Sequence, residues 1–164
     1  MNKTFLGTTK NGFSVYIDEE ASHALTHFAK KPELRDAVIA HIPSLEPDVE
    51  TYQTDIDTGS TIGTSDLVET TDESEIVYAK RPIRSIYSRF AKNTKPTPTS
   101  WITIALKKKG GDYWLHTAFV GKEVPSFPGG DYRPDESREF WSKHALVWGS
   151  QDIVPGTETT KCPW

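Results

Sequence analysis

Residues 101–120 constrain the fold most strongly, because they hold two β-prone runs on either side of a glycine turn. The runs are 101–106 and 113–120, and Gly110-Gly111 lies between them after three lysines. Aromatic and β-branched residues around a tight Gly-Gly turn are typical of a β-hairpin. We therefore predict a hairpin over 101–120 and place it at the centre of a sheet.

The other patterns predict helices first and strands afterwards. The expected elements are a strand at 13–17, helices at 18–31 and 33–42, a strand at 76–79, a helical turn or strand at 84–91, a short helix from 135 or 137 to 143 or 144, and a strand at 146–148. This order indicates an α+β fold, with N-terminal helices packed on an antiparallel sheet of four or more strands.

The length of 164 residues is close to that of one average domain. Five Trp, six Tyr and seven Phe are enough bulky side chains for a core, which argues against general disorder. We predict a single domain over 1–164 with its globular core at about 13–148. The stretch 45–75, rich in Thr, Ser, Asp and Glu, is expected to be a long acidic loop or a weak strand pair, and 149–164 a loose tail.

Several classes of protein are disfavoured by what the sequence lacks. No apolar run approaches the roughly 20 residues of a membrane span, and the N-terminus lacks the apolar stretch of a signal peptide. We therefore expect a cytoplasmic protein without a membrane partner, although delivery as part of a larger toxin is compatible with the sequence. The single cysteine, Cys162, excludes an internal disulfide and a multi-cysteine metal site.

The net charge of −4 conceals a basic segment within an acidic chain. Residues 76–111 hold nine basic residues and no acidic one: Lys80, Arg81, Arg84, Arg89, Lys92, Lys95, Lys107, Lys108 and Lys109. Such a segment can bind phosphate groups, and we expect Lys80, Arg84 and Arg89 to converge while 107–109 form an exposed turn tip. The alternative is a solvated basic edge that balances the acidic first half.

His23 and His27 lie four residues apart on the first expected helix, on the side opposite to its apolar residues. They could act as acid and base near neutral pH, or remain exposed without a role. A zinc pair is less favoured, since no third ligand is evident. His144, at the expected end of the last helix, could donate a proton or cap that helix.

The sequence lacks a nucleophile elbow and a glycine-rich phosphate loop. What remains is a metal-free and cofactor-free set of His, Arg, Lys and Thr, which suits RNA cleavage through the 2′-hydroxyl of the RNA itself. The predicted catalytic residues are His23, His27, Arg84, Arg89, Thr117 and His144. The predicted substrate-binding residues are Lys80, Arg81, Lys92 and His116.

The order of a histidine-bearing helix, a basic strand and a sheet ending in 115–119 (Leu-His-Thr-Ala-Phe) resembles the BECR ribonucleases. This superfamily includes barnase, EndoU, the colicin tRNA nucleases and RelE-type toxins. Segments 78–90 and 140–147 also look like motifs of a small bacterial family, and the resemblance covers about 13–148. It implies metal-independent RNA cleavage, with tRNA among the candidate substrates and a cognate inhibitor protein as a partner.

If the resemblance holds, the family's helix histidine corresponds to His23 or His27, and its late-strand hydroxyl to Thr117. Its basic strand positions correspond to Lys80, Arg84 or Arg89. Two alternatives remain open. One is a non-catalytic protein-binding module of the antitoxin, immunity or phage-inhibitor type, whose acidic stretch 45–75 would suit a basic partner. The other is a transferase that holds a nucleotide with Arg and His.

Overall fold

The computed structural model describes residues 2–82, 86–128 and 134–164. Contacts divide the chain into two compact units. Unit 1 comprises Met1–Gly63 and Pro98–Glu123, and unit 2 comprises Thr64–Thr97 and Val124–Trp164. The sequence predicted one domain, whereas the chain here crosses between two units three times.

The predicted α+β fold, with N-terminal helices packed on an antiparallel sheet, is wrong. The chain is mostly β, with 39% of residues in strands and 19% in helices, and its described part contains three small α-helices and several sheets. A strand pair precedes the first helix, which begins only at Ala24. Asp18 does not cap that helix, because its carboxylate accepts backbone N–H bonds from Glu20 and Ala21 in a turn.

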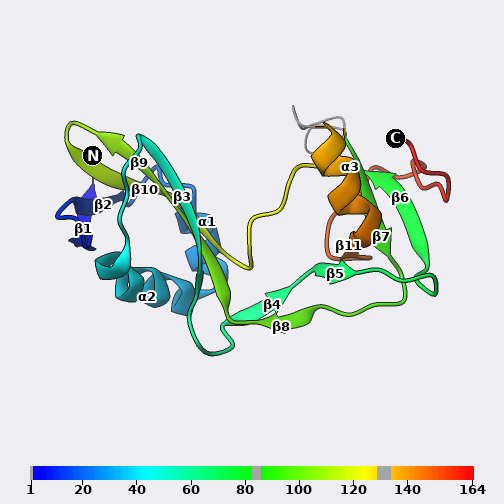
Figure 1. Ribbon diagram of the computed structural model, residues 1–164, viewed down its shortest axis with the longest axis horizontal. Helices are drawn as coiled ribbons and strands as arrows, with labels where there is room; N and C mark the ends of the chain where they lie inside the picture. The colour runs from blue at the N-terminus through cyan, green and yellow to red at the C-terminus, as the bar shows by residue number, and fades with distance from the viewer. Residues whose placement is uncertain (1, 83–85, 129–133) are drawn as a thin grey trace. The chain divides into compact units, whose positions relative to one another are not determined.

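Unit 1 is built on a five-stranded mixed sheet. Its strands, in spatial order, are β1 (Lys3–Thr8), β2 (Ser14–Asp18), β10 (Asp112–Val120), β9 (Trp101–Lys109) and β3 (Thr51–Asp57). Strands β2 and β10 run parallel, and the other pairs are antiparallel. Helices α1 (Ala24–Lys30) and α2 (Pro32–His41) and the short 3₁₀ helix η1 (Ile42–Ser44) complete the unit (Figure 1).

The core of unit 1 lies on one face of this sheet. Its members come from alternate strand positions and one stripe of each helix, including Val15, Ile17, Phe28, Leu34, Val38, Ile104 and Leu106, although Thr103 and Ala105 at the intervening positions of β9 are buried too. Because successive strand residues point to opposite faces, the side chains between these buried ones lie on the other face of the sheet. We call that second face the outer face.

The predicted hairpin is confirmed and lies at the centre of the sheet. Strands β9 and β10 pair antiparallel around Gly110 and Gly111, whose φ angles of 61° and 90° fit the type I′ turn that two-residue hairpin loops favour. The pairing shifts between Leu115 and Thr117, so that His116 is the extra residue of a β-bulge. Strict alternation along 113–120 therefore breaks at this histidine.

A bidentate ion pair joins the turn after β2 to helix α2. Arg35 donates from Nη1 and Nη2 to the two carboxylate oxygens of Glu19 at 2.8 and 2.7 Å, and Thr4 Oγ1 donates to Glu19 Oε2 at 2.8 Å. These hydrogen bonds, the one from Arg35 first, lower the pKa of Glu19 from 4.5 to about 2. Charge-assisted bonds of this geometry stabilise the ionised carboxylate.

We expect Glu19→Gln to lower the melting temperature at neutral pH and to have little effect at very low pH. A lowered pKa means that the carboxylate stabilises the fold fully above 4.5 and loses this contribution as the pH falls through about 2. Thermal unfolding followed by circular dichroism across this pH range measures the difference. Glu20→Gln, at the exposed neighbouring carboxyl, is the control; an equal pH dependence in both variants would contradict the assignment.

Unit 2 contains a four-stranded sheet and one helix. The strands, in spatial order, are β5 (Leu67–Glu69), β11 (His144–Val147), β7 (Tyr87–Ala91) and β6 (Ile76–Lys80), with β11 and β7 parallel. Helix α3 (Pro134–Lys143) leads directly into β11 (Figure 1). A separate two-stranded ribbon joins β4 (Gly63–Ser65) to β8 (Thr97–Thr99).

Two segments differ from their expected character. The stretch 45–75, expected to be a loop or a weak strand pair, contains β3, β4 and β5, each of which pairs with a strand far away in sequence. The tail 149–164, expected to be loose, pairs along the edge of β6. Thr159 exchanges two backbone hydrogen bonds of 2.8 Å with Tyr78, and Val154 N–H donates to the Lys80 carbonyl.

Candidate functional site

A pocket of about 370 Å³ in unit 1 brings several titratable side chains together. It lies where the turn after β2 meets the hairpin β9–β10. We call it the histidine pocket; the lining side chains used below are Asp18, His23, Lys107, Lys109, Trp114 and His116. Two of them, His23 and His116, belong to the residues predicted from the sequence.

The rings of His23 and His116 lie close together. Their centroids are 5.0 Å apart, with the ring planes inclined by 48°. His23 is exposed at the start of α1, and His116 is half-buried at the bulge of β10. Ser22 Oγ donates to the Leu115 carbonyl at 2.8 Å, which fastens the turn to the strand beside the bulge. The local backbone therefore holds both imidazoles at one place.

The surroundings of His116 favour its neutral form. Burial is the main cause that lowers its pKa below 6.5, followed by the positive charge of Lys107, by His23 and by Lys109. Asp18 is the lining carboxylate, and its Oδ1 already accepts two backbone N–H bonds. A neutral imidazole near pH 7 can accept a proton, so His116 has the character of a general base.

The turn of the hairpin sets the positions of the two lysines that line the pocket. A two-residue loop at Gly110-Gly111 fixes the pairing, so that Lys107 faces Trp114 and Lys109 faces Asp112. Lys107, Lys109 and Trp114 consequently share the outer face, while Lys108 points to the core side, where its Nζ lies 4.9 Å from the Phe13 ring centroid. The sequence-based prediction put all three lysines at a turn tip and did not include Trp114, although the hairpin register places Lys107 opposite Trp114.

His27 and Thr117, two other predicted catalytic residues of unit 1, lie outside the set that lines this pocket. His27 follows His23 by one helical turn, and its ring lies 6.1 Å from that of Phe119. Burial, and then the charge of Lys30, lower the pKa of His27. Thr117 pairs with Ala105 just beyond the bulge.

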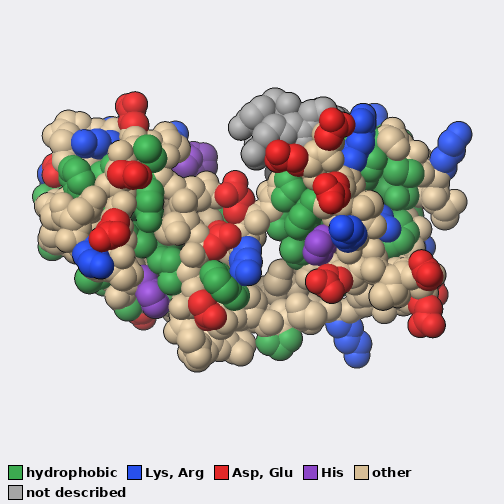
Figure 2. Space-filling view, in the orientation of Figure 1, with side chains coloured by type: hydrophobic (Ala, Val, Ile, Leu, Met, Phe, Trp, Pro, Cys, Tyr) green, Lys and Arg blue, Asp and Glu red, His purple; other side chains and the backbone are tan. Residues whose placement is uncertain are grey.

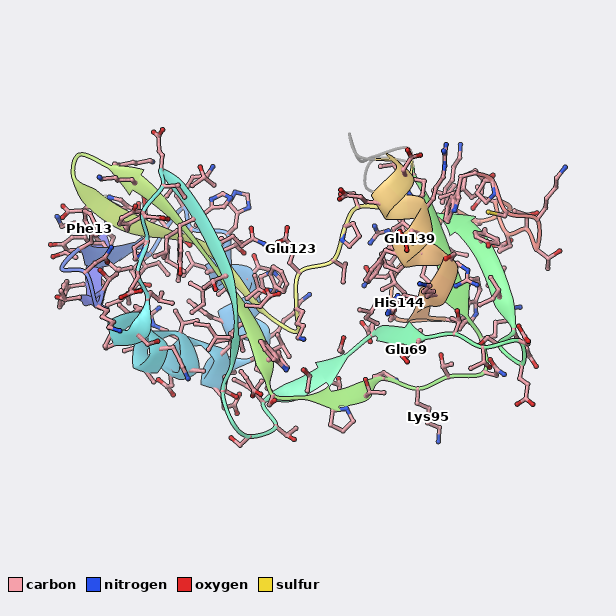
Figure 3. The ribbon with its side chains drawn as sticks, viewed as in Figure 1. Phe13, Glu69, Lys95, Glu123, Glu139 and His144 are labelled. Carbon is pink, nitrogen blue, oxygen red and sulfur yellow. The ribbon has the colours of Figure 1, made fainter. Side chains whose placement is uncertain are left out.

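The remaining predicted residues belong to unit 2. Arg89 has a structural role there, because its Nη1 donates to Thr70 Oγ1 and to the His144 carbonyl, both at 2.9 Å. The ring of His144 stacks on Phe140 at 4.2 Å, and its Nδ1 lies 3.0 Å from the Phe140 carbonyl, which is the helix-capping interpretation. His144 is labelled in Figure 3 near the end of α3. His144 also lines a shallow surface pocket with Glu136, Glu139 and Lys143.

Three basic side chains of unit 2 each lie over an aromatic ring. The cation-to-centroid distances are 5.3 Å for Lys80 over Tyr87, 5.4 Å for Arg81 over Phe127 and 5.2 Å for Lys92 over Trp148. Arg84 lies outside the described residues. The predicted catalytic and substrate-binding residues are divided between the two units. That they share a single cleft stays a prediction.

Charge segregation along the sequence does not produce a uniformly basic surface on the face in Figure 2, where acidic and basic side chains are interspersed. Within residues 2–82, 86–128 and 134–164, no group of three His, Cys, Asp or Glu side chains is placed to hold a metal ion. Nor does any helix of these segments have the length and apolarity needed to cross a membrane.

No protein-family model matches this chain, and no curated protein or solved structure is significantly similar to it.

Proposed function

We propose that this protein cleaves RNA through the 2′-hydroxyl of the RNA, with His23 and His116 as the acid–base pair. The observation that carries the proposal is the pair of imidazoles 5.0 Å apart in a lysine-lined pocket. At this separation one phosphate group can lie within hydrogen-bonding reach of both rings, which is the geometric requirement for proton transfer at a phosphodiester.

His116 is the base in this proposal, since burial and neighbouring lysines favour its neutral form. It takes the proton of the 2′-hydroxyl while the 2′-oxygen forms a bond to phosphorus. The bond from phosphorus to the 5′-oxygen then breaks, and His23, in its protonated form, gives a proton to that oxygen. The products are a 2′,3′-cyclic phosphate and a 5′-hydroxyl end, and the nucleophile comes from the substrate.

Lys107 and Lys109 supply positive charge for the phosphate. Both ammonium groups are exposed and line the pocket, so they can approach the phosphate oxygens as negative charge develops in the transition state. This proposal keeps the metal-independent RNA cleavage expected from the sequence and assigns it to His23, His116 and the two lysines. We propose the cytoplasm as the place of action and tRNA as a first substrate to test.

The test is incubation of the purified protein with total tRNA and a mixed oligoribonucleotide in EDTA. We expect RNA fragments with 2′,3′-cyclic phosphate ends. His41→Ala, at a histidine of α2 whose Nδ1 lies 2.8 Å from the Ala37 carbonyl, is a matched control that should cleave at the wild-type rate. Intact RNA with the wild-type protein would contradict the proposal and favour the protein-binding module.

A further inference from the structure

We propose that the outer face of unit 1 binds single-stranded RNA by stacking unpaired bases on a row of three aromatic rings. The row consists of Phe5, Tyr16 and Trp114, and it ends in the histidine pocket. This inference rests on the proposed cleavage site for the position of the scissile phosphate, but the binding surface can be tested without any cleavage.

The row crosses three neighbouring strands. Phe5 of β1 pairs with Tyr16 of β2, and Tyr16 pairs with Trp114 of β10. Both neighbouring ring pairs have centroids 5.6 Å apart, with planes inclined by 63° and 36°. The strand pairing, and not the fold of a single loop, therefore sets the spacing of the rings.

These rings are not part of the core. Phe5 is 54% exposed, and Tyr16 and Trp114 are half-buried, whereas Leu6 and Val15 beside them are buried on the helix side of the sheet. Single exposed apolar side chains are common on protein surfaces, whereas a contiguous apolar patch such as this row is typical of a binding surface. Nucleic acid bases stack on such rings regardless of base identity.

Positive charge beside the middle of the row and at its Trp114 end complements a phosphate backbone. Lys3 Nζ lies 4.2 Å from the Tyr16 ring centroid and 5.9 Å from that of Trp114, and Lys107 faces Trp114. Lys3 is exposed on a flexible side chain, so its ammonium can move from the ring to a phosphate while a base takes its place. Asp18 pairs with Lys3 in register, which limits the net positive charge.

Three aromatic rings with few positive charges favour a single-stranded nucleic acid over a duplex. Bases in a duplex are stacked and paired inside the helix, so they cannot reach the rings, and duplex binding relies on phosphate contacts alone. Unpaired bases can use both the rings and the lysines. Trp114 also lines the histidine pocket, so a strand stacked on the row would have a phosphate beside His116.

The experiment measures binding of a fluorescein-labelled 2′-O-methyl oligoribonucleotide by fluorescence anisotropy at one fixed salt concentration. The blocked 2′-oxygen prevents cleavage, so the readout is independent of His23 and His116. We expect the single strand to bind at least about tenfold more tightly than its duplex, and Tyr16→Ala and Phe5→Ala each to weaken single-strand binding by roughly tenfold. Tyr16→Phe, which keeps the ring, should bind like the wild type.

Val49→Ala is the matched control, since Val49 is 51% exposed but lies outside the row. Circular dichroism of each variant shows whether the fold is retained, and Phe5→Ala is the variant least expected to disturb it. Equal affinity for single strand and duplex, or unchanged affinity of both ring variants, would overturn the proposed surface. Selective single-strand binding without cleavage of ordinary RNA would support this surface and overturn the proposed function alone.

Discussion

His116→Ala is expected to lower the rate of RNA cleavage by roughly 10²-fold or more, the usual scale for loss of a general base. The residue accepts a proton in the proposed step, and its pKa is lowered mainly by burial, so the neutral form is available near pH 7. For the wild type, kcat should fall as the pH drops through the pKa of His116, below 6.5, because protonation removes the base. Single-turnover cleavage at several pH values measures both effects.

The double variant of His23 and His116 separates a catalytic pair from two independent contributions. Groups that act as a unit lose most of their effect with the first substitution, so the double variant should be little slower than either single one. Affinity for the 2′-O-methyl oligoribonucleotide should fall far less than the cleavage rate, because proton transfer is not part of that binding and the aromatic row still holds the bases. A wild-type rate in His116→Ala, or a wild-type rate that does not fall at any pH below 6.5, would contradict the assignment.

Local signals explain what the sequence could predict. The hairpin over 101–120 is specified by Gly110-Gly111 and by β-prone runs on both sides, all within twenty residues. The second helix was likewise predicted within about one residue at each end, because Pro32 and a four-residue apolar repeat define it locally. The two-residue turn of the hairpin also fixes the pairing of Lys107 with Trp114, so this pairing could have been derived from the sequence.

Other features depend on pairing between distant segments. The contact between His116 and His23 joins residues more than ninety positions apart, and the bulge at His116 is likewise not visible from alternation within one strand. Strand β3 has a polar sequence that resembles a loop, and β5 is only three residues long; both form because β9 and β11 offer them partners. The fold class was wrong for this reason.

The charge of a residue does not show which partners it contacts in the fold. Arg89 lies in a basic segment, but its hydrogen bonds to Thr70 and to the His144 carbonyl give it a structural role. The sequence shows that an arginine is present, whereas its partners are set by the neighbouring strands of the sheet. The basic segment 76–111 is divided between the two units, because β6 belongs to unit 2 and β9 to unit 1. Nothing in the amino-acid composition of the segment indicates this division.

Trp141→Ala is expected to have the largest effect on stability, lowering the free energy of unfolding by about 3–5 kcal/mol. Trp141 is 1% exposed and stacks on Phe127 with centroids 3.8 Å apart and planes inclined by 18°. Its Nε1 donates to the Pro125 carbonyl at 3.1 Å. Truncation leaves a cavity and removes a hydrogen bond, and domains are stable by only about 5–15 kcal/mol.

Trp141→Phe distinguishes packing from hydrogen bonding, because it keeps a stacking ring and loses the donor; we expect it to cost roughly 1–3 kcal/mol. Urea unfolding monitored by circular dichroism gives both values. Hydrogen exchange should show the largest loss of protection in β7 and β11, since the buried clusters of unit 2 are distinct from that of unit 1. If Trp141→Ala unfolds at the wild-type urea concentration, or if β9 and β10 lose protection first, Trp141 does not support unit 2 as described.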